Sequence, residues 1–185
     1  MRTTIDDVPV LGVMASSGTG KTTLLRALLP RLREAGLRVA CIKHTHHVID
    51  IDKPGKDSHT LRAAGAQQML LASPGGWALM VDAPATDGAD FTTLVRHLQL
   101  RSLDLVLVEG FKFEDFPKLA LHRHDLSGPW SAPYDDTVLA IASNQSPLPH
   151  AAVPVFALND AAGIATFIIQ HCARLRGLRD NDART

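Results

Sequence analysis

The sequence predicts an α/β protein with a mostly parallel central sheet, helices on both faces and a β-hairpin beside it. Short apolar runs alternate with amphipathic helical patterns along the chain, as in sheets built from strand–helix units. The run LDLVLVEGF at 103–111 is nearly all apolar, which is typical of a parallel strand covered on both faces. Pro74-Gly75-Gly76 separates two other apolar runs and predicts the hairpin.

The first elements are a strand, a helix and a second strand. VPVLGVM at 8–14 is expected to be a buried strand. Leucines then recur at helical spacing over 21–36, and Gly36 is a typical helix end. Pro30 should kink this helix, because an interior proline removes a backbone hydrogen bond. LRVACIKH at 37–44 predicts the next strand.

The rest of the chain continues the alternation. Asp57 or Ser58 is expected to cap a short helix that ends at Gly65. The hairpin strands are expected at 66–73 and 76–82. The remaining predicted elements are a helix capped by Asp90, strands at 103–111, 117–123, 137–143 and 153–158, and a last helix opened by Asn159 or Asp160.

Length and composition indicate one soluble domain. We expect it to span 1–175, with a polar tail over 176–185, since 185 residues suffice for a single substantial core. The 19 basic and 19 acidic residues cancel, which argues against a nucleic-acid binder. No run of 18 apolar residues and no signal-like N-terminus occur, so a membrane span is not expected. Cys41 and Cys172 are far apart and predict reduced thiols in a cytoplasmic protein.

The stretch MASSGTGKTT predicts a phosphate-binding loop, because it follows a strand and opens a helix. Gly18 and Gly20 allow close approach of the backbone, Lys21 can reach phosphates and Thr22 can ligate Mg²⁺. Ala15 stands where the motif usually opens with glycine, which is tolerable if its backbone stays in an ordinary region. The predicted binding residues are Ser17, Gly18, Thr19, Gly20, Lys21, Thr22 and Thr23.

An acid at the tip of a buried strand would complete such a site. Glu109 ends the apolar run before Gly110, and a carboxylate there could hold Mg²⁺ or orient an attacking water. We therefore expect Glu109 to act as a metal ligand and catalytic residue. Asp104 lies at the other end of the same strand, too far from the phosphates.

The segment KHTHHVIDIDKPGKDS is unusually rich in histidine and aspartate, with His44, His46, His47, Asp50 and Asp52. It could be a Zn²⁺ or Mn²⁺ site, or a plain polar loop. The interpretation we favour is a nucleotide-sensing switch, since the segment leaves the carboxyl edge of the sheet beside the phosphate-binding loop. Asp52 would then bind Mg²⁺ through a water of the metal, and Lys43 or Lys56 would bind phosphate.

The motifs SGTGKTTLL, KHTHH, DIDKPGKDS, AGA and LVEGFK, in this order over about residues 8–170, resemble the molybdopterin-guanine dinucleotide biosynthesis protein B family. The resemblance implies a P-loop NTPase fold, GTP with Mg²⁺, weak hydrolysis and a homodimer. It also implies work beside the molybdenum cofactor guanylyltransferase and other cofactor-assembly proteins, with molybdopterin a further candidate ligand. The metal or switch role falls on the block from Asp50 to Asp57 and on Glu109, with Asp52 and Glu109 as the metal and catalytic residues. The apolar Val48-Ile49 and the aromatic-rich FKFEDFPK depart from the pattern.

The residues alone do not select GTP over ATP. Asn144 and Asn159 follow predicted strands, where a base could be recognised, although Asn159 and Asp160 could equally cap the last helix. A small-molecule kinase and a metal-handling NTPase chaperone are the alternatives. A kinase lid would carry arginines, whereas the expected surface loop at 125–136 holds none and only Arg123 is near.

Overall fold

The computed structural model describes residues 1–45, 51–82, 90–127, 135–149 and 151–182, with side chains up to residue 177. The chain divides into two compact units. The first consists of Met1–His44 with Arg96–Thr185, and the second of Thr45–Val95. Each unit is described below by itself.

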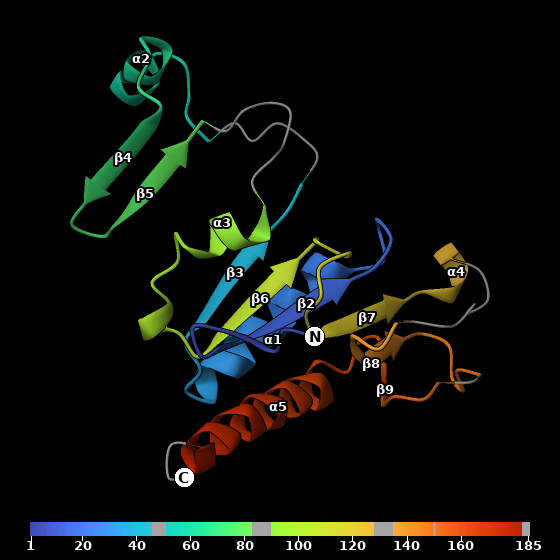
Figure 1. Cartoon of the computed structure of the whole chain (residues 1–185). Helices are drawn as coiled ribbons and strands as arrows, with labels where there is room; N and C mark the ends of the chain where they lie inside the picture. The colour runs from blue at the N-terminus through green and yellow to red at the C-terminus, as the bar shows by residue number, and fades with distance from the viewer. Residues whose placement is uncertain (46–50, 83–89, 128–134, 150, 183–185) are drawn as a thin grey trace. The chain divides into compact units, whose positions relative to one another are not determined.

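The first unit is built on a seven-stranded sheet in the order β3-β6-β2-β7-β8-β9, with β1 paired to β2 (Figure 1). All pairings are parallel except that of β1. Its elements are β1 (Thr4–Ile5), β2 (Val8–Met14), α1 (Lys21–Glu34), β3 (Val39–Lys43), η1 (Leu100–Ser102), β6 (Leu105–Glu109), β7 (Lys118–His122), α4 (His124–Ser127), β8 (Val138–Ser143), β9 (Val155–Ala157) and α5 (Ala161–Asp182). The expected mostly parallel sheet is confirmed.

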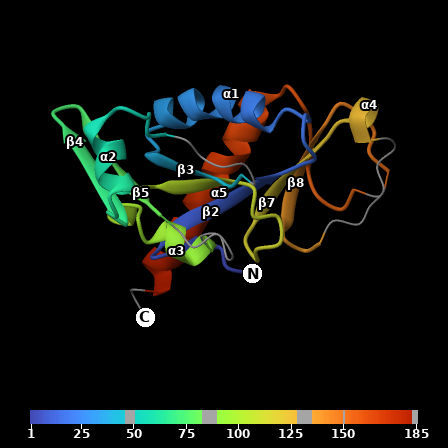
Figure 2. The same ribbon diagram turned by 90° about the horizontal axis from the view of Figure 1, so that it is seen from above.

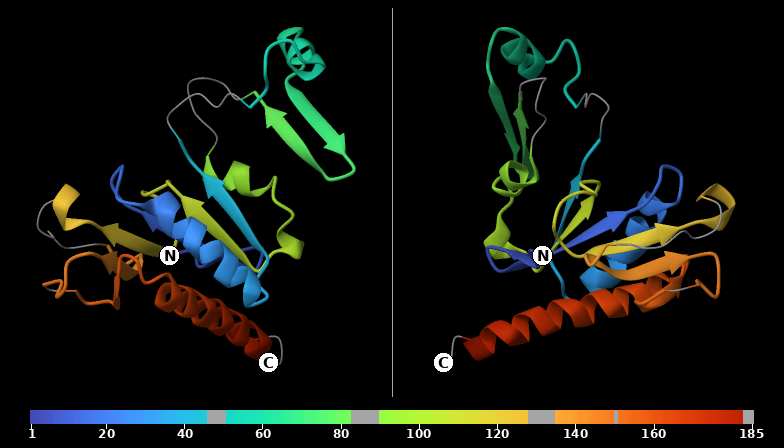
Figure 3. Two further views of the ribbon diagram at one scale, coloured as in Figure 1. Left: turned by 180° about the vertical axis from the view of Figure 1, so that it is seen from behind. Right: turned by 45° about the vertical axis from the view of Figure 1, so that its right-hand side comes forward.

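Helices α1 and α5 cover one face of this sheet (Figure 3). Leu28 and Leu32 of α1 are fully buried there, together with Ile164 and Ile168 of α5. Helix α1 continues through Pro30, because its apolar face is held in the core on both sides of the proline. Burial of such side chains is the main force that holds helix and sheet together.

Strand β2 lies at the centre of the sheet, between β6 and β7 (Figure 2). Gly12 is required here, since a Cβ at this position would lie 2.5 Å from the Phe116 ring. Beside it, the Lys118 ammonium is buried and donates hydrogen bonds to the Glu114 carbonyl and the Thr137 hydroxyl. Burial lowers the pKa of Lys118.

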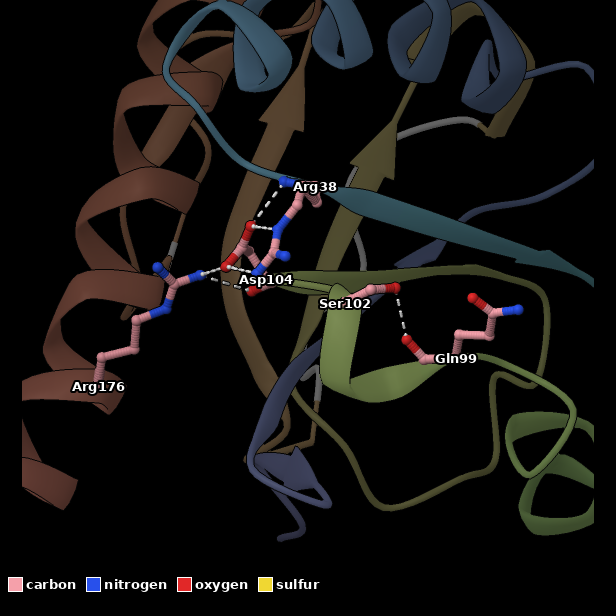
Figure 4. Close-up of polar contacts among 5 residues, drawn as sticks. All are labelled: Arg38, Gln99, Ser102, Asp104 and Arg176. Carbon is pink, nitrogen blue, oxygen red and sulfur yellow. Dashed lines mark hydrogen bonds and ion pairs between the residues drawn. The ribbon is translucent and has the colours of Figure 1, made fainter.

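An ion cluster joins three segments at the amino end of β6. Asp104 accepts hydrogen bonds from the backbone N–H and the Nε of Arg38, both at 2.8 Å, and pairs with Arg176 of α5 at 2.8 Å (Figure 4). Arg38 holds the pKa of Asp104 down at about 2. As expected from the sequence, Asp104 lies at the opposite end of β6 from Glu109.

The second unit contains α2 (Asp57–Ala63), the hairpin of β4 (Gln68–Ser73) and β5 (Gly76–Val81), and α3 (Phe91–Val95). The hairpin is antiparallel with Ser73 opposite Gly76, which confirms the prediction. Its apolar side chains are unusually exposed: Leu70 at 58% and Trp77 at 55%. A two-stranded hairpin is marginally stable by itself, so these side chains favour a further contact.

The helix ends that the sequence predicts are confirmed in part. Asp90 caps α3 by accepting a hydrogen bond from the Thr93 N–H, and Gly36 and Gly65 end their helices at positive φ. The predicted cap of α2 by Asp57 or Ser58 is wrong. Lys56 precedes this helix without a side-chain cap. Strand β1 and the short helix α4 were not predicted. No helix among the described residues is long and apolar enough to cross a membrane.

Candidate functional site

The phosphate-binding loop connects β2 to α1, as the sequence predicted for this segment. Gly18 and Gly20 have φ values of 78° and 111°, a region that glycine enters freely and other residues rarely do. Ala15 is not among the described residues with positive φ, so its methyl group is compatible with the loop. Thr19 is buried and donates its hydroxyl hydrogen bond to the Ser16 carbonyl at 3.0 Å, which holds the turn together.

The loop and the start of α1 carry hydrogen-bond donors for an anion. The Lys21 ammonium lies over the loop, where it donates to the carbonyls of Ala15 and Ser16 at 3.0 Å each. No side chain caps the start of α1, which leaves its first backbone N–H groups for an anion. Ser17, Thr22 and Thr23 are exposed at the same place.

A pocket of about 930 Å³ opens beside this loop. Thr19, Gly20 and Thr23 form one wall. The segments after β8 and β9 form the opposite wall, with Asn144, Gln145, Ser146, Pro147, Leu148, Leu158 and Asn159. The structure therefore brings three of the predicted phosphate residues and the two predicted base-contact asparagines to a single cavity at the carboxyl edge of the sheet, where α/β proteins bind ligands. Ser17, Gly18, Lys21 and Thr22 do not line this cavity.

The polar side chains of this pocket differ in how many of their hydrogen-bonding groups already have a partner. Asn144 accepts a hydrogen bond from the His124 N–H and donates to Asp125, both at 2.7 Å. Gln145 has a buried Oε1 without a hydrogen-bond partner among the described residues. Asn159 is exposed, while Asp160 caps α5 by accepting from the Gly163 N–H at 2.8 Å. The capping alternative is thus confirmed for Asp160.

Glu109 ends β6 at the same edge of the sheet, next to the β2 strand that leads into the loop. Its side chain is 13% exposed and lies 3.7 Å from the Lys43 ammonium of β3. Gly110 turns the chain at φ 102°, and a Cβ there would lie 2.8 Å from Cβ of His44. This turn keeps Glu109 and Lys43 paired at the sheet edge.

Asp52 belongs to the second unit. Its carboxylate is buried, accepts the Ser58 hydroxyl hydrogen bond at 2.7 Å and lies 3.5 Å from Nη1 of Arg62. Arg62 in turn reaches Asp82 at 2.6 Å. Within the second unit, Asp52 therefore links the segment before α2 to the helix itself and, through Arg62, to Asp82 at the end of the hairpin.

The remaining members of the histidine–aspartate segment, His46, His47 and Asp50, lie outside the described residues. Over the part of the chain that the structure describes, no three His, Cys, Asp or Glu side chains gather as a metal site. The described residues therefore add nothing in favour of a dedicated transition-metal centre.

Two pocket residues were missed by sequence reasoning. Arg123 follows the end of β7, and its Nε donates to the Thr19 carbonyl at 3.3 Å. Gln145 directly follows Asn144 in the pocket wall. Their place after parallel strands was the available signal, because the carboxyl ends of these strands meet at one edge.

The chain was compared with known proteins. The family model described as "Molybdopterin guanine dinucleotide synthesis protein B" matches residues 10–144. The molybdopterin-guanine dinucleotide biosynthesis adapter protein of Escherichia coli (strain K12) is 44% identical over 172 residues, which is 92% of this chain and 97% of that protein. The Haemophilus influenzae protein of the same name is 43% identical, over 75% of this chain and 76% of its own.

Solved structures agree with the sequence comparison. The crystal structure of Bacillus subtilis MobB superposes with a TM-score of 0.67 at 26% identity, over 88% of this chain and 97% of that one. The structure of a MobB homologue from Bacillus stearothermophilus gives a TM-score of 0.63, also at 26% identity, over 89% and 98%. The likeness extends over most of the chain.

Proposed function

Since the chain belongs to the molybdopterin-guanine dinucleotide synthesis protein B family, we propose that it is a GTP-binding adapter protein in the biosynthesis of the guanine dinucleotide form of molybdenum cofactor. The relatives' name supports the pathway and the adapter role. The observation that carries nucleotide binding is the loop with positive-φ glycines that opens onto the 930 Å³ pocket.

The residues present fit a nucleoside triphosphate with Mg²⁺. Lys21 and the first N–H groups of α1 would bind the phosphate oxygens, and the Thr22 hydroxyl would ligate the metal. Glu109 would hold a water of the metal or the attacking water. Bound Mg²⁺ would neutralise charge that develops on the phosphates. Hydrolysis would be weak, because Glu109 is already paired with Lys43.

The pocket wall supports guanine through one unpaired acceptor. Guanine presents two neighbouring N–H donors on its Watson–Crick edge, at N1 and at the 2-amino group, whereas adenine presents only its 6-amino group beside an acceptor ring nitrogen. The buried Gln145 Oε1 needs a donor, because an unsatisfied buried acceptor costs about 1–3 kcal/mol. Asn159 is the second candidate for contact with the base. That Asn144 contacts the base stays a prediction.

The metal or catalytic role of Asp52 also stays a prediction. Its contacts with Ser58 and Arg62 favour a role in holding α2.

The proposed partners are a second copy of the chain, the molybdenum cofactor guanylyltransferase and other cofactor-assembly proteins, with molybdopterin as a candidate ligand and the cytoplasm as the location. The exposed apolar hairpin supports such contacts, since clustered exposed apolar side chains mark interaction surfaces. Light scattering at micromolar concentration should give twice the monomer mass of 20.0 kDa.

Calorimetric titration with GTP and with ATP, each with Mg²⁺, tests the nucleotide proposal. We expect GTP to bind at least roughly tenfold more tightly, because a difference of about 1.4 kcal/mol follows from one well-matched polar contact. Equal affinity would refute guanine selectivity, and no binding of either would refute nucleotide binding. Co-purification with the guanylyltransferase tests the adapter role separately.

A further inference from the structure

The side chain of Arg123 contacts the phosphate-binding loop at Thr19 and Gly20, whereas the Lys21 ammonium contacts it at Ala15 and Ser16. It comes from the residue after β7, which pairs with β2 on the side away from β6. Its Nε donates to the Thr19 carbonyl at 3.3 Å, and its Nη2 lies 3.7 Å from the position that a Cβ of Gly20 would occupy. The Arg123 side chain is 35% exposed and lines the pocket.

A short chain of contacts holds this guanidinium in place. Nη1 of Arg123 lies 4.0 Å from Asp125. Asp125 accepts a hydrogen bond from the Asn144 amide at 2.7 Å, and the carbonyl oxygen of the same amide accepts from the His124 N–H. The hydrogen bond from Asn144 lowers the pKa of Asp125, so this carboxylate stays ionised beside the arginine at neutral pH.

One donor group of Arg123 is left over. Nε is used by the Thr19 carbonyl and Nη1 faces Asp125, whereas Nη2 has no hydrogen-bond partner among the described residues. Nη2 is also the atom nearest to Gly20. A guanidinium is always charged and presents its donors in a plane that matches two phosphate oxygens. The free end of Arg123 is thus directed to the part of the loop where the phosphates would lie.

We propose that Arg123 binds the phosphate chain of the nucleotide and that Asn144, acting through Asp125, is its positioning residue. The inference rests on the proposed nucleotide binding and adds a second cation to Lys21. It also gives Asn144 a role that uses both atoms of its amide as they lie in the structure. The arginine follows β7 at the carboxyl edge of the sheet, whereas the sequence alone placed it only near the expected surface loop at 125–136.

The test compares the affinities of GTP, GDP and guanosine for the wild type and for Arg123→Ala, Arg123→Gln and Arg123→Lys. Arg26→Ala is the matched control, because Arg26 is exposed on α1 and does not line the pocket. Arg123→Ala should weaken GTP binding roughly 10- to 100-fold, as expected for a hydrogen bond to a charged group. Guanosine affinity should change less than about threefold, because it carries no phosphate.

Arg123→Lys and Arg123→Gln distinguish phosphate binding by Arg123 from a purely structural role in which Arg123 only holds the loop. Arg123→Lys should recover part of the GTP affinity because it keeps the charge. Arg123→Gln, which keeps a donor for the Thr19 carbonyl, should be as weak as alanine. Recovery by glutamine and not by lysine would overturn the proposal. Circular dichroism and thermal unfolding of each variant would show that the fold is retained.

A double-mutant cycle tests the positioning role. Asn144→Ala should weaken GTP binding in the wild type and have almost no effect in the Arg123→Ala background, since contacting residues couple. Additive effects would overturn the role of Asn144. If the wild type binds GTP and Arg123→Ala binds it equally well, only this inference fails. If the wild type binds no triphosphate, the proposed function itself fails.

Discussion

At the scale of single residues, Lys21 gives the sharpest test of the site. Lys21→Ala should weaken GTP binding by roughly 100-fold, since a charge-assisted hydrogen bond to phosphate contributes about 1.5–3 kcal/mol. The midpoint of thermal unfolding should hardly move, because the hydrogen bonds that Lys21 donates to two loop carbonyls are partly exposed to solvent and contribute little to stability. Calorimetry measures the affinity, and Lys112→Ala serves as a control at an exposed lysine. An unchanged GTP affinity would remove Lys21 from the site.

Glu109 is expected to affect hydrolysis more than binding. Glu109→Gln keeps the shape but removes the charge that would hold metal or water, so GTP turnover should fall by roughly 100-fold. The dissociation constant of GTP should stay within about threefold, because the phosphate contacts come from the loop. A phosphate-release assay and calorimetry on the same protein measure the two quantities. Glu114→Gln, at an exposed carboxylate, is the control, and equal losses in both quantities would contradict the role.

At the scale of elements, β2 depends on the absence of a side chain at Gly12. Gly12→Ala would place a Cβ 2.5 Å from the Phe116 ring and 3.2 Å from Lys118. Such overpacking should lower the free energy of unfolding by about 1–3 kcal/mol, measured by urea unfolding. Gly75→Ala is the matched control, since a Cβ there meets nothing within 4 Å. If both variants were equally stable, the close packing of β2 under Phe116 would be disproved.

Elements with a strong local pattern were predictable, and elements that depend on distant partners were not. The apolar run that became β6 and the turn that closes the hairpin were both recognised, because periodicity and turn residues act locally. Strand β1 escaped, since Thr4–Ile5 is a strand only through its pairing with β2. Ser58 does not cap α2 because the helix begins one residue earlier, at Asp57, and the Ser58 hydroxyl donates to Asp52 instead.

The site followed the same division. The phosphate-binding loop could be predicted from a contiguous motif, and Glu109 from its place after a buried strand. Arg123 and Gln145 belong to the pocket only because β7 and β8 end beside the loop, and a sequence without its strand order does not reveal this. For Asn144 the position was foreseen, but its amide is used by His124 and Asp125.

At the scale of the whole molecule, Asp104 ties together segments far apart in the chain. Its pKa of about 2 lies below the unfolded value of about 3.9, so its ionised form stabilises the fold above about pH 4. This stabilisation should disappear as the pH falls towards 2. Asp104→Asn should therefore lower the free energy of unfolding at pH 7 by about 1–2 kcal/mol, with allowance for the exposed arginines.

Urea unfolding at pH 7 and at pH 3 checks this prediction. The difference between wild type and Asp104→Asn should be largest at pH 7 and smaller at pH 3, whereas Asp136→Asn, at an exposed carboxylate, should show little difference at either pH. A loss of equal size at both pH values would mean that charge is not what Asp104 contributes.

That residues 1–175 form a single domain stays a prediction.

The position of β2 also has a consequence during synthesis on the ribosome. The strand that leads into the phosphate-binding loop emerges well before its partners, since Val10 pairs with Val106 and Gly12 with Lys118. Until those partners leave the exit tunnel, a nascent chain carries an apolar strand without β6 and β7 beside it, and such strands are prone to aggregate. Chaperone protection of the N-terminal half should therefore persist until translation has passed β7.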